Sequence, residues 1–303
     1  MSLAVRYSEH GGPEVLEVVD VDEPHAGAGE VRVAVRAAGL NPYDFKVRRG
    51  GYGKPIPLPT GQGAEFAGVV DEVGDGVTDV SVGDEVLGFT SFAAQAEFVV
   101  VPSSRTAPKP AELDWAVAGG IGLVGNTAER SVGSLGLTPG DTVLVTAGAG
   151  GVGLLATQFA RKAGATVVAT ASEPHHEFLR SLGAIPIAYG DGEIGRARAA
   201  APGGFTAALD NVGRSGVELA LALDIPPARI NSIADYEAGE RFGIANVGGG
   251  GKNREGLERL ARAAATGEIV FPILAAYPLA EVADAYRRLE ERSGLGKIVL
   301  TVP

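Results

Sequence analysis

Cysteine is absent from the 303-residue chain. Without it the protein can form no disulfide, carry no thiolate nucleophile and hold no cysteine-ligated zinc or iron–sulfur centre. Long apolar runs are missing as well, since no stretch approaches the roughly 18 consecutive apolar residues of a membrane-spanning helix. Residues 1–6 lack the charged start and apolar core of a secretory signal. These absences predict a cytoplasmic protein with no membrane partner.

Basic side chains are in deficit, with 26 Lys and Arg against 37 Asp and Glu and a net charge of −11. A surface of that sign repels phosphate backbones, so nucleic acid is not an expected partner, although a local basic pocket for a small anion stays open. Glycine is in excess, with 45 residues, about twice its usual share. The glycines follow no G-X-Y period, which excludes a collagen-like chain. The length suggests two domains or one large one.

Three regimes of sequence pattern follow one another along the chain. Residues 1–113 carry short β-branched runs separated by glycine-rich turns, which predict a small barrel-like β domain. Residues 114–266 alternate strand and helix patterns, which predict a doubly wound parallel sheet with its ligand at the carboxyl ends of the strands. Residues 267–303 contain a helix at 279–292 and a strand at 297–302. Because so few elements cannot bury a core alone, we expect them to complete the first domain.

The middle regime supplies the elements of the predicted sheet. The predicted strands are 142–146, 166–170, 185–189, 207–210, 229–233 and 242–247, and the predicted helices are 152–163, 178–182 and 216–223. No clear helix pattern lies between the last two strands. The run Gly248–Gly251 is either a flexible turn or a place where the backbone closely approaches a ligand.

A glycine-rich turn gives the strongest chemical signal. Residues 148–153, Gly-Ala-Gly-Gly-Val-Gly, fit the pattern G-x-G-x-x-G directly after a strand and at the start of a helix. In a dinucleotide site Gly148 permits the tight turn, Gly150 lets the backbone approach a pyrophosphate, and Gly153 lets the helix pack closely. The exposed amides and the positive end of the helix attract the phosphates. A merely structural glycine turn is the alternative.

The end of the next strand bears on the choice between NAD and NADP. An acidic residue there would hold the ribose 2′-hydroxyl, whereas a serine with basic neighbours would accept a 2′-phosphate. Ser172 occupies this position, Glu173 follows it, and His175, His176 and Arg180 lie nearby. We therefore expect NADPH, with NADH less favoured. Alternatively, the two histidines only form a solvated start of a helix.

Several motifs together resemble a known superfamily. Residues 143–153, with Ala156, Gln158, Ala160 and Gly164-Ala165 after them, are similar to the medium-chain dehydrogenase/reductase superfamily. Segments 38–44, 49–50, 63–70, 82–86 and 296–300 resemble its quinone oxidoreductase branch. The resemblance implies a GroES-like catalytic domain formed by residues 1–113 and 267–303. It also implies an inserted Rossmann dinucleotide-binding domain at 114–266, with a cleft between the two domains where nicotinamide meets substrate.

Departures from the zinc-dependent members concern the metal ligands. Asn41 stands where those members have a cysteine, and Ala64 stands where they have a histidine. The four histidines of the chain do not fall at ligand positions, and a catalytic zinc normally needs three protein ligands. We therefore expect no metal. The zinc-free branch implies hydride transfer from the nicotinamide to a quinone or another conjugated carbonyl, in which a hydrogen-bond donor stabilises the carbonyl oxygen.

Candidate donors lie in and near the first motif. Asn41 is expected to position the substrate, because an amide does not titrate, and Tyr43 or Tyr52 to give a proton or a hydrogen bond. Tyr43 is equally well explained by burial in the barrel, and Tyr52 by shaping the pocket. Glu65 is expected to be structural, bracing a turn.

The resemblance also implies a set of cofactor contacts, in the helix before the glycine turn, in the turn itself and at the strand ends. The expected residues are Thr127, Gly148, Ala149, Gly150, Gly151, Val152, Ser172, His176, Tyr189, Asn211, Ser232, Ile233, Asn246 and Val247. Tyr189 either stacks near the adenine, bonds the 2′-phosphate or only packs at the end of the sheet.

Two other functions stay open. One is an enoyl or alkenal reductase that applies the same hydride step to a C=C bond, and the other is a non-catalytic NADPH-binding redox sensor. The resemblance further implies a homodimer, in which the strand predicted at 242–247 would pair with its copy in a second subunit.

Overall fold

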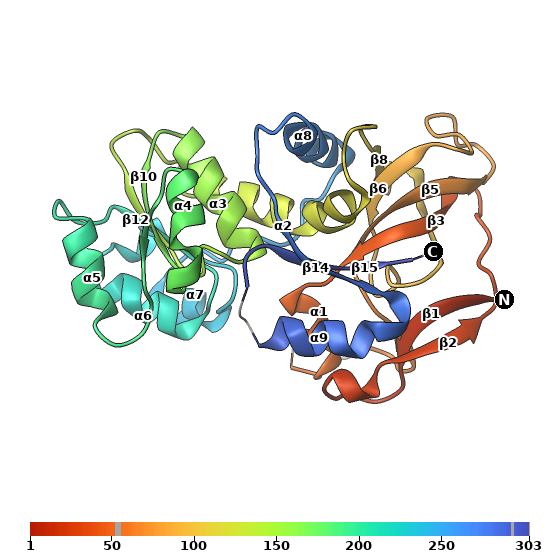
Figure 1. Ribbon diagram of the computed structural model, residues 1–303, viewed down its shortest axis with the longest axis horizontal. Helices are drawn as coiled ribbons and strands as arrows, with labels where there is room; N and C mark the ends of the chain where they lie inside the picture. Colours follow the sequence, from red (N-terminus) through yellow and green to blue (C-terminus); the bar gives the residue numbers. More distant parts are fainter. Residues whose placement is uncertain (52–55, 292–293, 303) are drawn as a thin grey trace. The chain divides into compact units, whose positions relative to one another are not determined.

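The computed structural model describes residues 1–51, 56–291 and 294–302 (Figure 1). The chain folds into two compact units. The first comprises Met1–Leu123, Lys252–Ser293 and Lys297–Pro303, and the second Val124–Gly251 and Gly294–Gly296. Residues 114–123 and 252–266 thus fall in the first unit, whereas the sequence pattern grouped them with the second. The domain boundaries expected from the sequence stay a prediction.

Most strands of the first unit join one large sheet. Its strands are β1 (Ser2–Tyr7), β2 (Glu17–Val21), β3 (Glu30–Gly39), β4 (Thr60–Gly61), β5 (Glu65–Val73), β6 (Glu85–Phe89), β7 (Phe98–Pro102), β8 (Thr106–Pro108), β14 (Ile273–Pro278) and β15 (Lys297–Thr301). The large sheet has the order β14-β15-β3-β5-β6-β8 with β7 also paired to β3, and β2-β1-β4 form a separate sheet. The helices are α1 (Pro42–Arg48), α8 (Arg254–Ala265) and α9 (Val282–Glu290), while α2 (Trp115–Gly133) runs across the division between the units.

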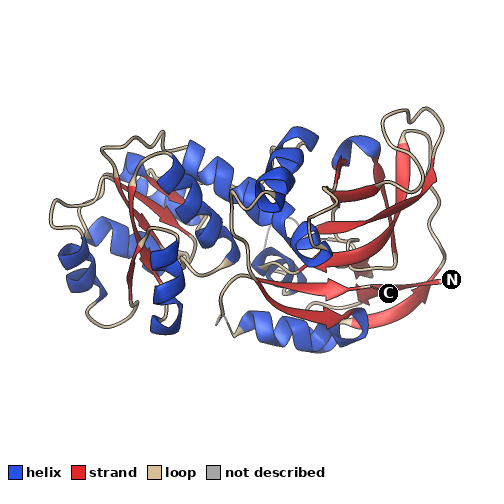
Figure 2. Ribbon diagram, turned by 45° about the horizontal axis from the view of Figure 1, so that its top comes forward, coloured by secondary structure: helices blue, strands red, loops and turns tan. Residues whose placement is uncertain are grey.

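The C-terminal segment returns to the N-terminal sheet. Strand β15 pairs antiparallel with β3, with Val299 opposite Gly39, and parallel with β14. Figure 2 shows α9 beside β14 and β15, and its Val282, Ala285 and Tyr286 are buried in the same core as Ile298. The helix and the strand of the C-terminal segment therefore complete this core.

The second unit is a parallel sheet flanked by helices. Its strands are β9 (Thr142–Val145), β10 (Thr166–Thr170), β11 (Ile185–Ile187), β12 (Ala207–Asp210) and β13 (Ile230–Ser232), and its helices are α3 (Gly151–Lys162), α4 (His176–Ser181), α5 (Glu193–Ala200), α6 (Arg214–Ala222) and α7 (Glu237–Phe242). The strand order is β11-β10-β9-β12-β13 and every pairing is parallel. From β9 the chain adds β10 and β11 on one side of the sheet and then β12 and β13 on the other side. A doubly wound fold binds its ligand at the point where the strand order reverses in this way. The predicted fold class is confirmed.

The strand predicted at 242–247 is wrong. Helix α7 occupies 237–242 and ends at Gly243, whose φ of 71° is a left-handed cap, and only an isolated bridge from Ala245 to Asn231 follows. The helix forms because Asp235 Oδ1 accepts a hydrogen bond from the Ala238 amide at 3.0 Å, which satisfies an N-terminal N–H. The described residues therefore offer no continuous strand here for pairing with a second subunit.

Candidate functional site

The glycine turn joins β9 to α3 through an unusual backbone path. Ala147 has a φ of 49°, in the left-handed region, and its amide donates to Thr170 Oγ1 at 3.1 Å. The Gly148 amide donates to the Thr170 carbonyl at 2.8 Å and the Gly150 amide to the Ala147 carbonyl at 3.0 Å. Gly150 is the N-cap of α3. These bonds anchor the turn to β10, so the amino end of the helix has a fixed direction.

The three glycines of the motif differ in the space that a Cβ atom would have. A Cβ on Gly148 would lie 2.8 Å from the Ala169 Cβ, and one on Gly153 only 2.1 Å from the Ala147 carbonyl oxygen. A Cβ on Gly150 would meet nothing closer than 3.4 Å. Gly148 and Gly153 are therefore required by packing within the protein, whereas at Gly150 the protein itself leaves room. The fold itself therefore does not require a glycine at 150.

Asp210 ties together the carboxyl ends of neighbouring strands. Its carboxylate accepts hydrogen bonds from the Thr146 hydroxyl at 2.9 Å, the Ser232 hydroxyl at 2.6 Å and the amides of Val212 and Gly213, both at 3.0 Å. Burial raises the pKa of Asp210, and these hydrogen bonds partly offset that effect. Ser232 is thus committed to Asp210, so its side chain acts on the strand ends.

Asn211 follows Asp210 at the same edge of the sheet. Its amide Nδ2 donates to the Thr146 carbonyl at 2.8 Å, and its backbone N–H donates to the Thr146 hydroxyl at 2.8 Å. Within the described part of the chain, the Asn211 Oδ1 atom is buried and has no hydrogen-bond partner. A buried acceptor without a partner is costly. This atom is therefore suited to accept a hydrogen bond from a ligand.

The adenosine-side candidates lie where β10 and β11 end. Thr170 is opposite Ile187 in the parallel register, and the Ala171 amide donates to the Ile187 carbonyl at 3.0 Å. Ser172 lies two residues after Thr170, and Tyr189 lies two residues after Ile187. The Tyr189 side chain is 62% exposed. Packing at the end of the sheet therefore does not explain Tyr189. His176 Nε2 lies 3.1 Å from the Ala171 carbonyl oxygen and bonds it, which fixes the ring beside Ser172.

The remaining predicted contacts gather around the glycine run 248–251. A Cβ on Gly248 would come within 2.6 Å of the Ile233 Cγ2 and 3.2 Å of the Thr127 Cγ2. Asn246 Nδ2 donates to the Ser232 carbonyl at 2.9 Å, and the Val247 amide donates to Asn231 Oδ1 at 2.7 Å. The structure thus brings Thr127, Ile233, Asn246 and Val247 together beyond β13. The run is a held turn, because the Gly250 carbonyl also accepts from Asn126 Nδ2 at 3.0 Å.

In the first unit, Asn41 belongs to a buried cluster with Glu65 and Lys297. The Lys297 ammonium donates to Asn41 Oδ1 at 2.5 Å and to Glu65 Oε1 at 2.7 Å. Asn41 Nδ2 donates to the same Glu65 oxygen at 2.9 Å, and Glu65 Oε2 accepts from the Leu123 amide at 2.7 Å. All three side chains are at most 3% exposed. Sequence reasoning missed Lys297, and it gave Glu65 only a turn-bracing role.

Of the two candidate tyrosines, only Tyr43 lies within the described residues. Tyr43 lies on α1, partly buried, with its ring stacked on Phe92 at 6.2 Å between centroids. Full burial in the barrel therefore does not describe Tyr43. Tyr52 lies outside the described residues.

Zinc does not fit the positions at which the zinc-dependent members carry their metal ligands. Among residues 1–51, 56–291 and 294–302, no group of three or more His, Asp or Glu side chains is arranged to hold a metal ion. At Asn41 the neighbouring group is the Lys297 ammonium, which repels a cation, and its contact uses the amide oxygen that would otherwise bind a metal. Ala64, at the other former ligand position, has no donor atom.

Asp44, beside this cluster, gives a testable pH dependence. Its Oδ2 accepts from the Asn41 amide at 2.8 Å and from the Tyr286 hydroxyl at 3.1 Å, whereas its buried Oδ1 has no hydrogen-bond partner among the described residues. Burial raises the pKa of Asp44 from 3.8 to about 7, and the Asn41 amide bond and the Lys297 charge oppose that rise. The folded state thus holds a proton that the unfolded chain releases above pH 4.

We expect Asp44→Asn to flatten the pH dependence of the free energy of unfolding. In the wild type the stabilising contribution of protonated Asp44 is full below pH 4 and is lost as the pH rises to about 7, a change on the order of 4 kcal/mol. The asparagine keeps an acceptor oxygen and does not titrate, so it should become more stable than the wild type by pH 7. Urea denaturation between pH 4 and 8 measures this, with Asp84→Asn, an exposed turn residue, as the control. Parallel curves for wild type and Asp44→Asn would contradict it.

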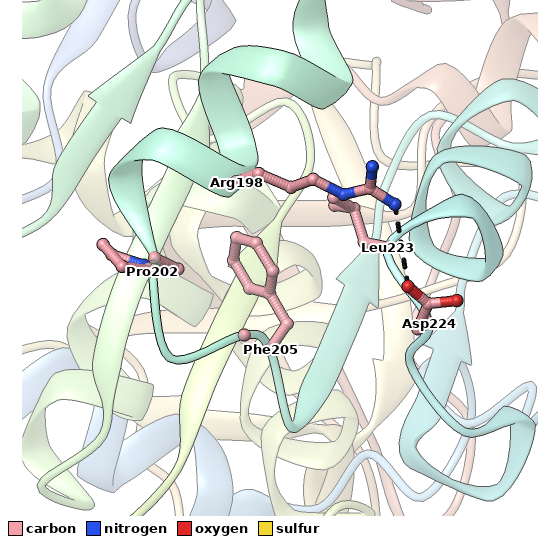
Figure 3. Close-up of a pocket in the computed structure, with 7 residues that line it drawn as sticks. Arg198, Pro202, Phe205, Leu223 and Asp224 are labelled. Atoms are coloured by element: carbon pink, nitrogen blue, oxygen red, sulfur yellow. Dashed lines mark ion pairs between the residues drawn. The ribbon is translucent and has the colours of Figure 1, made fainter.

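A surface pocket of about 350 Å³ lies elsewhere on the second unit. Figure 3 shows Arg198, Pro202, Phe205, Leu223 and Asp224 around it, with Arg198 and Asp224 in an ion pair at 3.6 Å. Phe205 and Asp224 precede β12 and β13, so the pocket is at the amino ends of these strands. The glycine turn is at the carboxyl ends, and the pocket is therefore separate from the predicted cofactor site. No helix in the described part of the chain is both long and apolar enough to span a membrane.

Comparison with known proteins matches two parts of the chain to family models. Residues 27–111 match the alcohol dehydrogenase GroES-like domain, and residues 182–300 match the family described as zinc-binding dehydrogenase. A curated relative, the chloroplastic NADPH-dependent alkenal/one oxidoreductase of Arabidopsis thaliana, is 32% identical over 97% of this chain and 78% of its own length.

Solved structures agree over the whole length. The quinone oxidoreductase of Coxiella burnetii superposes with a TM-score of 0.91 at 29% identity and covers 100% of this chain and 99% of its own. The Escherichia coli quinone oxidoreductase complexed with NADPH gives a TM-score of 0.87 at 26% identity and covers 99% of both chains. Fold, glycine turn and relatives together place this chain in the medium-chain dehydrogenase/reductase superfamily, in its quinone oxidoreductase branch.

Proposed function

We propose that the protein is an oxidoreductase that transfers a hydride from NADPH, without zinc, to a quinone or another conjugated carbonyl acceptor. The observation that carries this proposal is the turn at residues 148–153, where the protein leaves space above Gly150 at the start of α3. The similar proteins support the acceptor class, because one is named an alkenal/one oxidoreductase and others quinone oxidoreductases, one of them complexed with NADPH.

The residues at the carboxyl ends of the strands fit a dinucleotide phosphate. The amides of 151–153 and the positive end of α3 would hold the pyrophosphate. Asn211 Oδ1, a buried acceptor without a described partner, would accept a hydrogen bond from the nicotinamide half. Ser172, His176 and Tyr189 would receive the adenosine end, and Ser172 in place of an acidic residue favours NADPH over NADH. When bound, the cofactor supplies the hydride.

On the catalytic side, Asn41 has a defined orientation. Its oxygen is taken by Lys297, and Glu65 accepts from one of the two N–H bonds of Nδ2. The second N–H is the one that would donate to the acceptor's carbonyl oxygen, where negative charge develops. Tyr43, on the helix that Asn41 caps, and Tyr52 are the proposed alternative donors to that oxygen.

Two alternatives use the same cofactor site. The first is reduction of a C=C bond in an enone or an enoyl thioester, which the alkenal/one oxidoreductase relative favours. The second is a redox sensor that binds NADPH and has no acceptor. The hydrogen-bonded Asn41 favours an enzyme, since a sensor has no need of an oriented donor there.

Turnover with two acceptor panels tests the proposal. We expect NADPH oxidation with simple quinones or with short alkenals and enones, at a kcat/KM at least tenfold above that with NADH, because the 2′-phosphate would be bound. Absorbance at 340 nm measures the rate. Tight NADPH binding without turnover on either panel would contradict the enzyme and favour the sensor. Tighter binding of NADH than of NADPH would overturn the assignment of Ser172.

The cytoplasmic location and the homodimer remain proposals. Residues 242–247 do not form the expected strand, so any self-association through them must use the short segment around Ala245. Analytical ultracentrifugation over a hundredfold range of protein concentration is the test. A concentration-independent monomer would end the dimer proposal.

A further inference from the structure

Tyr189 lies on a loop with little regular structure of its own. The loop follows the three-residue edge strand β11 and leads into α5 at Glu193. Residues 188–191 have no helix or strand structure and contain Gly190, whose φ of 89° lies in the left-handed region. The Glu193 amide bonds the Gly190 carbonyl at 2.9 Å, but no strand pairing satisfies the rest of the loop backbone, so the loop needs further support.

Arg196 supplies that support from the first turns of α5. Its Nε donates to the Ala188 carbonyl at 2.9 Å and its Nη1 to the Asp191 carbonyl at 2.8 Å. Its Nη2 donates to the carbonyls of Tyr189 and Gly190 at 3.3 and 3.2 Å. One guanidinium therefore binds four consecutive carbonyl groups, which uses the fixed fork of donors that only arginine has.

The loop held in this way runs alongside the end of β10. Because Thr170 pairs with Ile187, Ser172 and Tyr189 each follow that pair by two residues at the same end of the sheet, and Ser172 is the residue expected to meet the 2′-phosphate. His176, bonded to the Ala171 carbonyl, borders the same end of the sheet. Tyr189 is 62% exposed, so its ring is available to a ligand at the carboxyl edge.

We infer that Arg196 is a positioning residue for the adenosine end of the cofactor, because its guanidinium holds loop 188–191 and with it the Tyr189 side chain beside Ser172. The inference rests on the proposed NADPH-dependent function. Arg196 touches no ligand in this arrangement and acts by removing the entropy that the loop would otherwise lose on binding. The effect should therefore appear in cofactor affinity and be absent from the hydride step.

Dissociation constants for NADPH, measured by quenching of protein fluorescence, test the inference. We expect Arg196→Ala and Tyr189→Ala each to raise the dissociation constant about tenfold, which corresponds to about 1.4 kcal/mol. The double variant should also stay near tenfold, because Arg196 acts through Tyr189. In steady state, Arg196→Ala should raise the KM for NADPH and leave kcat unchanged. Arg196→Lys, which keeps the charge and loses the fork, should fall between wild type and alanine.

Arg198→Ala is the matched control. Arg198 lies on the same helix, but its guanidinium bonds the Ala222 carbonyl and pairs with Asp224 at the opposite edge of the sheet (Figure 3). It should bind NADPH as the wild type does, which would support the specific role of Arg196. Equal affinity losses in Arg196→Ala and Arg198→Ala would overturn the inference, since they indicate general damage to α5.

Two further outcomes would also overturn it. A hundredfold loss in the double variant would show that Arg196 acts independently of Tyr189. A wild-type dissociation constant in either single variant would show that the substituted side chain does not contribute to NADPH binding. Failure of the proposed function looks different, because the wild type would then either bind no NADPH or bind it without turning over either acceptor panel.

Discussion

Gly150→Ala should fold like the wild type and bind NADPH about 100-fold more weakly, a loss of about 2.7 kcal/mol. The new methyl group would meet only the Ala147 carbonyl oxygen, at an ordinary 3.4 Å, and the φ of −77° suits alanine. The fold therefore gives no reason for a glycine at this position. A pyrophosphate that approaches the backbone at the start of α3 would collide with the methyl group.

The matched variant is Gly153→Ala. There the methyl group would lie 2.1 Å from the Ala147 carbonyl oxygen, so the turn itself must shift. We expect it to lower the free energy of unfolding by about 2–3 kcal/mol, as overpacking does. Urea denaturation and NADPH titration of both variants separate the two effects. Unchanged NADPH affinity in a folded Gly150→Ala variant would refute the dinucleotide interpretation of the turn.

This contrast shows what a sequence pattern can and cannot supply. The strand before the turn, the helix after it and the order of the sheet follow from local signals, namely apolar runs, breakers and the spacing of three glycines. The pattern assigned Gly153 to packing between helix and sheet. In the structure its tightest neighbour is the carbonyl of Ala147 within the turn, a contact set by the left-handed φ of a non-glycine residue. The periodicity of a sequence does not predict such a backbone angle.

The segment at 234–247 was mispredicted for a related reason. Phe242, Ile244 and Val247 resemble a short apolar strand, and a single glycine in it is compatible with a bulge. Asp235, capping the Ala238 amide, and Gly243, ending α7, instead divide the segment into a helix and an extended tail. The six residues of α7 have too few periodic positions to distinguish a helix from a strand, so the cap and tertiary contacts decided between the two.

The burial of Lys297 could not be predicted from the sequence because its partners are remote in the chain. It lies 232 residues from Glu65 and 256 from Asn41, and β15 reaches them only by pairing with β3. A lysine that opens an apolar strand is ordinarily interpreted as a solvated end. Its burial at 3% exposure becomes comprehensible only when the facing carboxylate and amide oxygens are known.

Lys297→Met should therefore be one of the most damaging substitutions in the protein. It leaves the Glu65 carboxylate, 1% exposed, without its cation, and loss of one partner of a buried ion pair costs about 3–5 kcal/mol of the free energy of unfolding. It also frees the Asn41 oxygen, so the amide is no longer oriented for an acceptor. Urea denaturation measures the first effect, and kcat with a saturating quinone measures the second.

A second substitution separates the two effects. Lys297→Met combined with Glu65→Gln removes both charges, and the single oxygen of the glutamine can still accept from the Leu123 amide. Because the buried charge is gone, most of the lost free energy of unfolding should return. kcat should stay low, since Asn41 Oδ1 still lacks the Lys297 ammonium that fixes its direction. If the double variant regained stability and full turnover together, Lys297 would serve only to neutralise Glu65. If it stayed as unstable as Lys297→Met, packing of the lysine stem would outweigh the charge pair.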